Sequence, residues 1–108
     1  MAAWVFFERI EEWDLAFVPE YRKIASASVA KYGGRYRALS FENEVVEGPG
    51  SAPGMISVIE FDSREIAKRW LNSPEYAPAL ALRNTGVRNR VIIMDAGPPG
   101  YAKDAGAI

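Results

Sequence analysis

The chain has 108 residues, of which 49% are apolar and 25% charged, and its formal net charge is −1. This length supports one domain with its own hydrophobic core, and the balanced charge excludes the basic surface of a nucleic-acid-binding protein. Cysteine and histidine are both absent, which excludes disulfides, thiolate metal sites, thiol nucleophiles and a histidine general base. An all-oxygen carboxylate site for Mg²⁺ or Ca²⁺ stays open, but no spaced cluster of aspartates supports one. We expect no metal and no cofactor. The apolar runs are too short to span a membrane and no signal peptide is evident, so a cytoplasmic protein is expected.

The first part of the chain alternates between strand-like and helix-like patterns. Residues 4–10 are rich in aromatic and β-branched residues, which is typical of a strand. A helix is expected to run from Asp14, as its N-terminal cap, to about Tyr32. Gly33 suits the left-handed position that follows a helix. Residues 35–47 are then predicted to form a long second strand.

The pattern continues after a flexible loop. Residues 48–54 consist mostly of glycine and proline and predict that loop. Residues 55–61 predict the third strand. Asp62 or Ser63 can cap the next helix, whose apolar stripe consists of Ile66, Ala67, Trp70 and Leu71.

A short additional helix and a last strand complete the domain. The helix starts around Ser73, where a hydroxyl cap precedes Pro74 and Glu75. Residues 89–95 predict the last strand. We expect residues 1–96 to form the single domain and residues 97–108, which are mostly small, to form a flexible tail.

The order strand-helix-strand occurs twice, which predicts an α+β fold of the ferredoxin-like βαββαβ type. Its four-stranded antiparallel sheet would carry the helices on one face only. A sheet with one face in water should alternate between apolar and polar residues. The first, third and last strands instead carry large apolar side chains on both faces, such as Trp4 with Val5 and Ile92 with Ile93. We therefore expect a homodimer in which the sheets of two copies pack face to face.

Several short motifs together resemble one family. They are Tyr32-Gly33-Gly34-Arg35-Tyr36, Glu44-Val45-Val46-Glu47-Gly48, Ile59-Glu60-Phe61 followed by Ala67 and Trp70, Ser73-Pro74-Glu75-Tyr76, and Arg83. In order and spacing the chain is similar to the 1330 family of domains of unknown function, within the dimeric α/β-barrel superfamily. The resemblance implies a βαββαβ fold and a homodimer formed through the sheets. It implies no catalytic residues.

Glu60 is the one candidate for a catalytic group. It shares a strand face with Val58, so its carboxylate is expected on or near an apolar surface. Burial there would raise its pKa and suit a general base. A salt bridge to an arginine such as Arg9, Arg83 or Arg90 is an equally favoured alternative.

The candidates for ligand binding are Tyr32, Arg35, Glu47, Trp70, Tyr76 and Arg83. Arg35 and Glu47, at the expected ends of the second strand, could position a substrate, but a surface ion pair is the favoured interpretation. The aromatic residues could line a flat pocket, although aromatic residues at helical spacing more often belong to a core. Arg83 could hold a ligand carboxylate or cap neighbouring carbonyl groups.

Three functions remain open from the sequence. The first is a homodimeric protein that binds a small, partly aromatic or acidic metabolite between sheet and helices. The second is a cofactor-independent monooxygenase or isomerase like those of the same superfamily, an analogy of fold alone. The third is a structural or interaction module without a ligand. A closed pocket with converging polar groups would separate the first two from the third. Neither nucleic acid nor membrane is expected as a partner.

Overall fold

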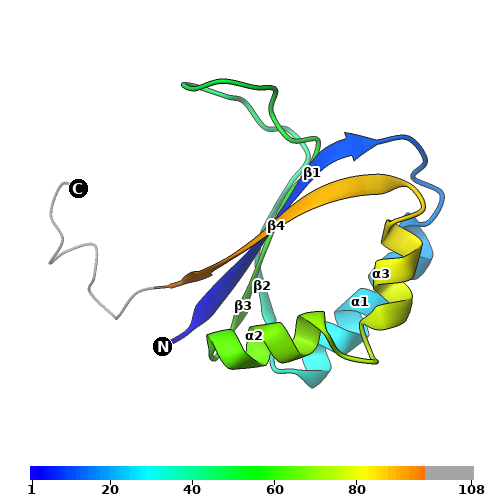
Figure 1. The fold of residues 1–108 in the computed structure, drawn as a ribbon, viewed down its shortest axis with the longest axis vertical. Coiled ribbons are helices and arrows are strands. Elements are labelled where there is room, and N and C mark those ends of the chain that lie inside the picture. The colour runs from blue at the N-terminus through cyan, green and yellow to red at the C-terminus, as the bar shows by residue number, and fades with distance from the viewer. Residues whose placement is uncertain (97–108) are drawn as a thin grey trace, which may run out of the picture.

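The computed structural model describes residues 1–96. Its elements are β1 (Ala3–Glu12), α1 (Val18–Lys31), β2 (Arg35–Ser40), β3 (Ile56–Phe61), α2 (Arg64–Leu71), α3 (Ala77–Arg83) and β4 (Val87–Asp95), shown in Figure 1. The predicted tail at residues 97–108 lies outside the described part of the chain. Within residues 1–96, no helix has the length and apolar character needed to cross a membrane.

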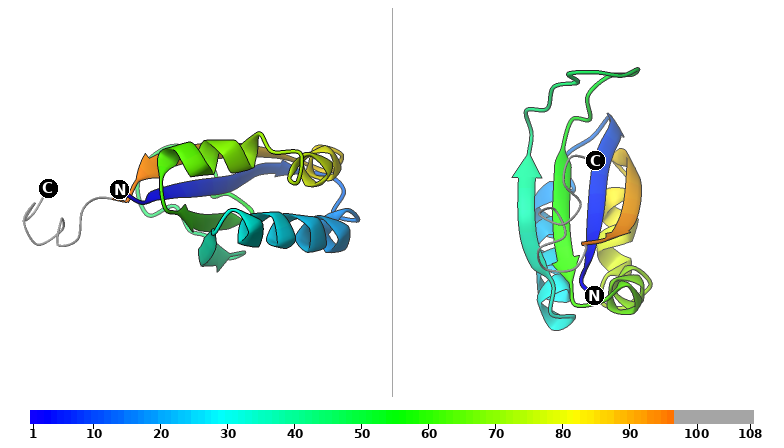
Figure 2. Two further views of the ribbon diagram at one scale, coloured as in Figure 1. Left: turned by 90° about the horizontal axis from the view of Figure 1, so that it is seen from below. Right: turned by 90° about the vertical axis from the view of Figure 1, so that its left-hand side faces the viewer.

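The four strands form one antiparallel sheet in the order β2-β3-β1-β4, so β1 and β3 are its central strands. All three helices lie on one face of this sheet (Figures 1 and 2). In the right-hand view of Figure 2, the strands lie in front and the helices behind them. The predicted ferredoxin-like βαββαβ sandwich is therefore confirmed, with a short helix α3 after α2. Helix α3 begins at Ala77, so the predicted start around Ser73 is wrong.

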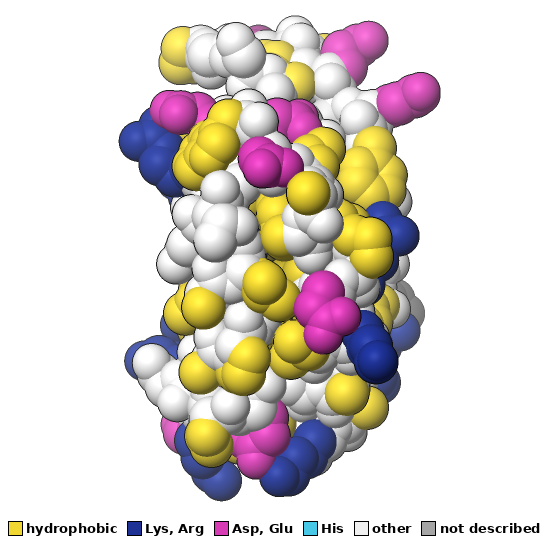
Figure 3. Space-filling model, turned by 90° about the vertical axis from the view of Figure 1, so that its right-hand side faces the viewer, with side chains coloured by type: hydrophobic (Ala, Val, Ile, Leu, Met, Phe, Trp, Pro, Cys, Tyr) yellow, Lys and Arg dark blue, Asp and Glu magenta, His cyan; other side chains and the backbone are white. Residues whose placement is uncertain are grey.

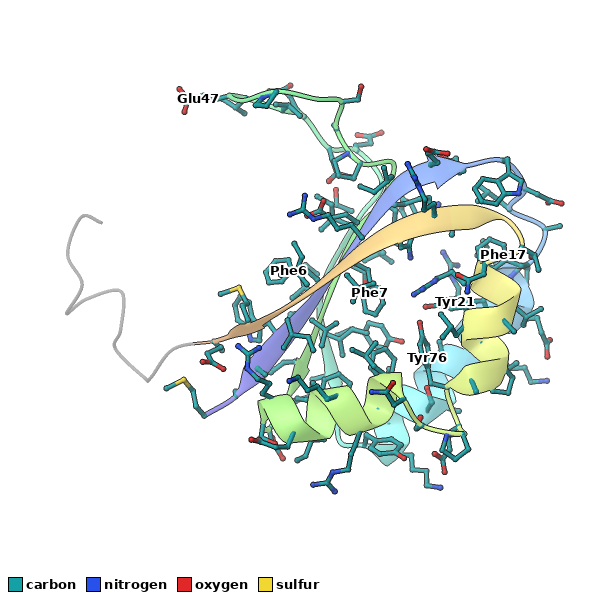
Figure 4. All side chains as sticks on the ribbon, in the orientation of Figure 1. Phe6, Phe7, Phe17, Tyr21, Glu47 and Tyr76 are labelled. Carbon is teal, nitrogen blue, oxygen red and sulfur yellow. The ribbon has the colours of Figure 1, made fainter. Side chains whose placement is uncertain are left out.

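Apolar side chains occupy both faces of the central strands, as the sequence predicts. Val5, Phe7 and Ile59 are buried beneath the helices. Phe6 and Phe7 point to opposite sides of the sheet (Figure 4). The strand pairing places a second apolar set on the face without helices, which we call the outer face; this set consists of Trp4, Phe6, Ile56, Val58, Ile92 and Met94.

The core between sheet and helices is centred on the fully buried Trp70. Its ring centroid lies 4.3 Å from that of Tyr76, 5.2 Å from that of Phe61 and 5.9 Å from that of Phe7. The indole Nε1 of Trp70 donates a hydrogen bond to the Ser28 hydroxyl at 2.9 Å. The core thus joins α1, α2 and the two central strands through one tryptophan.

Helix α1 begins later than predicted but ends as predicted. Asp14 does not cap it; its carboxylate instead accepts a hydrogen bond from the backbone N–H of Ala16 at 2.9 Å, in a turn ahead of the helix. The helix starts at Val18. Gly33 follows the last turn with a φ of +72°, the left-handed conformation that glycine adopts without strain.

Strand β2 ends at Ser40, so the prediction of a strand to residue 47 is wrong. Residues 41–55 form a loop that projects from the body toward the side opposite the helices (Figure 1). Val46, near its tip, is 87% exposed. Valine has a high strand propensity, but this segment has no neighbouring strand with which to pair.

The base of this loop is held by one side chain. The Asn43 amide Nδ2 donates to the carbonyl oxygens of Ser40 and Pro53, each at 3.1 Å. This amide therefore links the start of the loop, at the end of β2, to the end of the loop, just before β3.

Candidate functional site

A cavity of about 280 Å³ lies between the sheet and helices α1 and α3. Figure 4 shows Phe7 extending from the sheet toward the helices, with Phe17 and Tyr21 across from it. The cavity is lined mainly by apolar and aromatic side chains together with a few polar ones: Phe7, Arg9, Phe17, Val18, Tyr21, Arg22, Ala25, Ser26, Tyr36, Leu39, Phe41, Met55, Ser57, Ile59, Trp70, Arg83, Val87 and Asn89.

The cavity opens beside the edge strand β2. Tyr36, Leu39 and Phe41 line it and are nevertheless 52%, 57% and 53% exposed, which places them at its rim. On the helix-bearing side of the molecule, apolar side chains reach the surface between charged side chains of both signs (Figure 3). An apolar rim of this kind suits entry of a ligand with an apolar part.

Three polar atoms in the cavity wall lack hydrogen-bond partners. They are Arg9 Nε, Arg83 Nε and Asn89 Oδ1, and no other buried side-chain nitrogen or oxygen in residues 1–96 is unpartnered. Arg9 on β1 lies directly opposite Asn89 on β4 in the strand pairing, and the Arg83 guanidinium lies over the Phe7 ring, 6.0 Å from its centroid. Buried polar groups are almost always paired in folded proteins, so this cluster marks a site that a ligand can complete.

The cavity also carries an uncompensated positive charge. Arg9, Arg22 and Arg83 line it, but no aspartate or glutamate does. None of these arginines forms an ion pair with another residue of the described chain. Within residues 1–96 there is also no group of three or more acidic side chains placed to hold a metal ion. The electrostatics of the cavity therefore favour an anion.

A chain of hydrogen bonds runs from Arg83 to the cavity wall. Arg83 Nη1 donates to the Tyr76 hydroxyl at 3.2 Å, and the hydroxyls of Tyr76 and Tyr21 lie 3.1 Å apart. Burial raises the pKa of Tyr21 and of Tyr76 above the ordinary value. Tyr36 is half exposed, and its partial burial raises its pKa to about 12. All three phenols therefore remain protonated at neutral pH and act as neutral hydrogen-bonding groups.

The structure brings together only part of the predicted ligand-binding set. Trp70 and Arg83 line the cavity, and Tyr76 lies directly behind them in contact with both. Tyr32 lies elsewhere, where its hydroxyl donates to the Glu75 carboxylate at 2.9 Å. Glu47 lies at the tip of the β2–β3 loop (Figure 4), and not at a strand end as predicted.

Glu60 is on the outer face, away from the cavity, so the expectation that it shares a site with Trp70 and Arg83 is wrong. Its carboxylate accepts hydrogen bonds from Trp4 Nε1 at 2.8 Å and Arg37 Nη2 at 2.7 Å, and from Arg35 Nε at 3.1 Å. These bonds, first that from Trp4 and then those from the arginines, lower the pKa of Glu60 to about 2. The predicted rise in pKa is therefore wrong as well.

Glu60 forms an ion pair, which was the alternative interpretation of this residue. Its partners are Arg35 and Arg37 on the neighbouring strand β2, and not the arginines expected from the sequence. Arg35 also pairs with Asp62 at 3.0 Å. A carboxylate held ionised in this way is a poor general base.

We expect Glu60→Gln to flatten the dependence of stability on acid pH. Because the pKa of Glu60 in the folded state, about 2, lies below its ordinary value of 4.5, the ionised carboxylate stabilises the fold above pH 4.5, and this contribution is lost as the pH falls toward 2. Urea unfolding of parent and variant at several pH values from 6 to about 2 measures it. Glu20→Gln is the matched control, because Glu20 is exposed and has no ion pair among the described residues. Equal acid slopes for Glu60→Gln and the parent would contradict the role of this ion pair.

The sequence interpretation missed three residues of the cavity, namely Arg9, Tyr21 and Asn89. A signal for Arg9 was available, because it follows Val5 and Phe7 at strand spacing and so shares their buried face. Tyr21 has helical spacing with Val18 and Ala25, which by itself indicates only the apolar core stripe of a helix. Asn89 was expected at the start of the last strand, but β4 starts at Val87, which places Asn89 within the sheet.

Comparison with known proteins finds one family. The model of the family described as Domain of unknown function (DUF1330) matches residues 6–96 of the chain. No curated protein matches the sequence of this chain.

Solved structures share the fold at low sequence identity. A protein of unknown function from Rhodopseudomonas palustris is 15% identical with a TM-score of 0.72, covering 91% of this chain and 84% of that one. A dimeric ferredoxin-like protein of unknown function from a Jannaschia species is 10% identical with a TM-score of 0.67, covering 89% and 100%. The cofactor-independent oxygenase SnoaB from Streptomyces nogalater is 10% identical with a TM-score of 0.53, covering 90% and 93%.

Proposed function

We propose a function for this chain, which belongs to the DUF1330 family of domains of unknown function: it binds a small organic anion with an apolar or aromatic body. The observation that carries the proposal is the pair of buried, unpartnered Nε atoms of Arg9 and Arg83 in a cavity without a carboxylate. Both arginine residues are half-buried, and a buried N–H group without a hydrogen-bond partner is costly to the fold. A ligand carboxylate would supply a counter-charge and accept charge-assisted hydrogen bonds.

The cavity has the size and lining that such a ligand requires. Its volume of about 280 Å³ is close to that of roughly nine water molecules in the liquid, enough for a carboxylate with one aromatic ring. Phe7, Phe17 and Trp70 supply aromatic walls. Burial of the ligand's apolar part would contribute to its affinity, while the arginines would select the acid.

Binding is proposed in preference to catalysis because of the groups present. The described lining contains no aspartate, glutamate or histidine, and the tyrosines stay protonated at neutral pH because burial raises the pKa of Tyr21 and of Tyr76. A reaction like that of a cofactor-independent oxygenase would need a group that accepts a proton from the substrate. None of the described residues that line the cavity is suited to accept a proton from a substrate at neutral pH.

We expect phenylacetate, as a simple aromatic acid, to bind the parent and to lose at least about tenfold in affinity in Arg83→Gln, because a hydrogen bond to a charged group is worth about 1.5–3 kcal/mol. Isothermal titration calorimetry measures it. Arg9→Gln should show a similar loss. Arg88→Gln is the matched control, since Arg88 is exposed, pairs with Glu11 and does not line the cavity. Thermal unfolding of each variant separates lost binding from lost folding. Unchanged affinity in both folded variants, or no binding to the parent, would contradict the proposal.

We also propose that a second copy of the chain covers the outer face. The apolar set around Trp4 and Val58 on this face has no helix over it, and a face of this kind is normally covered. The Jannaschia protein of similar fold is dimeric by its description. The partner sheet would also shield the Glu60 ion pair from water.

We expect Met94→Glu to dissociate this homodimer at micromolar concentration. Met94 lies opposite Trp4 in the strand pairing and is 42% exposed, so a charge there is tolerated in the single chain but would be desolvated in the interface. Sedimentation equilibrium measures the mass. Leu15→Glu is the matched control, because Leu15 is equally exposed and lies in the connection between β1 and α1. A parent that sediments as one chain of 12.0 kDa would overturn the proposed dimer.

A further inference from the structure

The cavity wall contains unpartnered polar groups of opposite hydrogen-bonding character. Arg9 Nε is a buried donor without a partner, and Asn89 Oδ1 is a buried acceptor without one. The two residues form a directly opposed pair on β1 and β4, so their Cβ atoms are only about 4.5–5.5 Å apart. A carboxylate would satisfy the arginine, but it cannot donate to the Asn89 oxygen.

A hydroxyl next to the carboxylate would satisfy both. It can donate to the Asn89 oxygen while the carboxylate accepts from Arg9. A hydroxyl also suits the reverse orientation of the Asn89 amide, because it accepts as well as donates. Because Arg9 and Asn89 are directly opposed in the strand pairing, the simplest ligand carries its hydroxyl close to its carboxylate.

Tyr21 supplies a further donor for the carboxylate. The Tyr76 hydroxyl accepts from Arg83 Nη1, and in the described chain its only other partner is the Tyr21 hydroxyl. Tyr76 is fully buried, so its own proton must go to Tyr21 to be satisfied. Tyr21 then accepts from Tyr76, which leaves the Tyr21 proton free for a group in the cavity.

We infer that the ligand is a small hydroxy acid with an aromatic or hydrocarbon body, its carboxylate held by Arg9, Arg83 and Tyr21 and its adjacent hydroxyl held by Asn89. This inference rests on the proposed anion-binding function and narrows it to one chemical class. The apolar part of the ligand lies against Phe7 and the other aromatic side chains that line the cavity.

The test compares mandelate with phenylacetate, which share a ring and a carboxylate and differ in the hydroxyl next to the carboxylate. Both enantiomers of mandelate are titrated into the full chain by calorimetry. We expect one enantiomer to bind about tenfold more tightly than phenylacetate, because an acid without the hydroxyl leaves Asn89 unpaired. In Asn89→Leu, which keeps the size of the side chain, that preference should disappear while phenylacetate affinity is retained.

Tyr21→Phe provides the complementary variant. It should weaken both acids by a similar factor, because Tyr21 contacts the carboxylate that they share. Asn89→Leu should fold at least as stably as the parent, since it replaces an unpartnered buried polar group with an apolar one. Equal binding of mandelate and phenylacetate that still depends on Arg83 would overturn the hydroxy-acid inference and leave anion binding intact. If neither acid binds the parent, both the hydroxy-acid inference and the proposed anion binding are overturned.

Discussion

Trp70→Ala is expected to lower the free energy of unfolding by about 3–5 kcal/mol, the usual cost of removing a large aromatic side chain from a core. Trp70 is fully buried, and its ring lies against those of Tyr76 and Phe61. Its loss would also remove the hydrogen bond to Ser28. Urea unfolding followed by circular dichroism measures the change.

Trp13→Ala is the matched control for this substitution. Trp13 is 60% exposed, and its indole Nε1 donates to the carbonyl oxygen of Thr85 at 3.0 Å. Removing it should cost about 1 kcal/mol, the value of one exposed hydrogen bond and some surface packing. Similar losses for the two tryptophans would show that the core does not depend on Trp70 as the packing indicates.

Gly86→Ala is expected to destabilise the fold by about 3 kcal/mol, at the upper end of the range for overpacking. A Cβ built on Gly86 would lie 1.7 Å from the backbone oxygen of Asp14 and 2.8 Å from the Phe17 ring. The backbone cannot easily move away, because the Gly86 carbonyl oxygen accepts from the N–H groups of Trp13 and Asp14 at 2.9 and 3.2 Å. Because Phe17 lines the cavity, phenylacetate binding should weaken as well.

Gly33→Ala separates crowding from backbone strain. A Cβ at Gly33 would meet nothing within 4 Å, so alanine there is opposed only by the positive φ of +72°. That strain costs about 1–2 kcal/mol. Unfolding experiments should therefore rank Gly86→Ala as clearly the more damaging of the two, and the reverse order would show that the β1–α1 turn adapts to a side chain.

The fold could be predicted from the sequence because its signals are local. The glycine after α1 marks the end of that helix, the aromatic and β-branched runs mark the strands, and Trp70 marks the buried side of α2. The second strand was overextended because Val45 and Val46 have strand propensity whatever their surroundings. Whether such residues pair depends on a neighbouring strand, which a single sequence does not specify.

The candidate site was harder to predict, and Glu60 shows why. Strand alternation correctly groups Glu60 with Val58 on one face. Both faces of the sheet are apolar, however, so alternation cannot say which face the helices cover. Arg83 could be predicted as a site residue because it lies on the short helix that the Ser73-Pro74-Glu75 pattern indicates. Arg9 and Asn89, in contrast, come together only through the pairing of β1 with β4.

The loop between β2 and β3 begins and ends at the cavity, since Phe41 and Met55 both line it. The tip of the same loop, where Glu47 lies, projects on the side where the proposed second copy would lie (Figures 1 and 4). A partner that contacts the tip and a ligand in the cavity would therefore act on one segment. Thermodynamic linkage makes such a coupling reciprocal: the ligand would strengthen the dimer by the factor by which the dimer strengthens ligand binding. The apparent affinity for the ligand would then rise with protein concentration. The abundance of the protein would therefore set the ligand concentration at which the cavity becomes occupied.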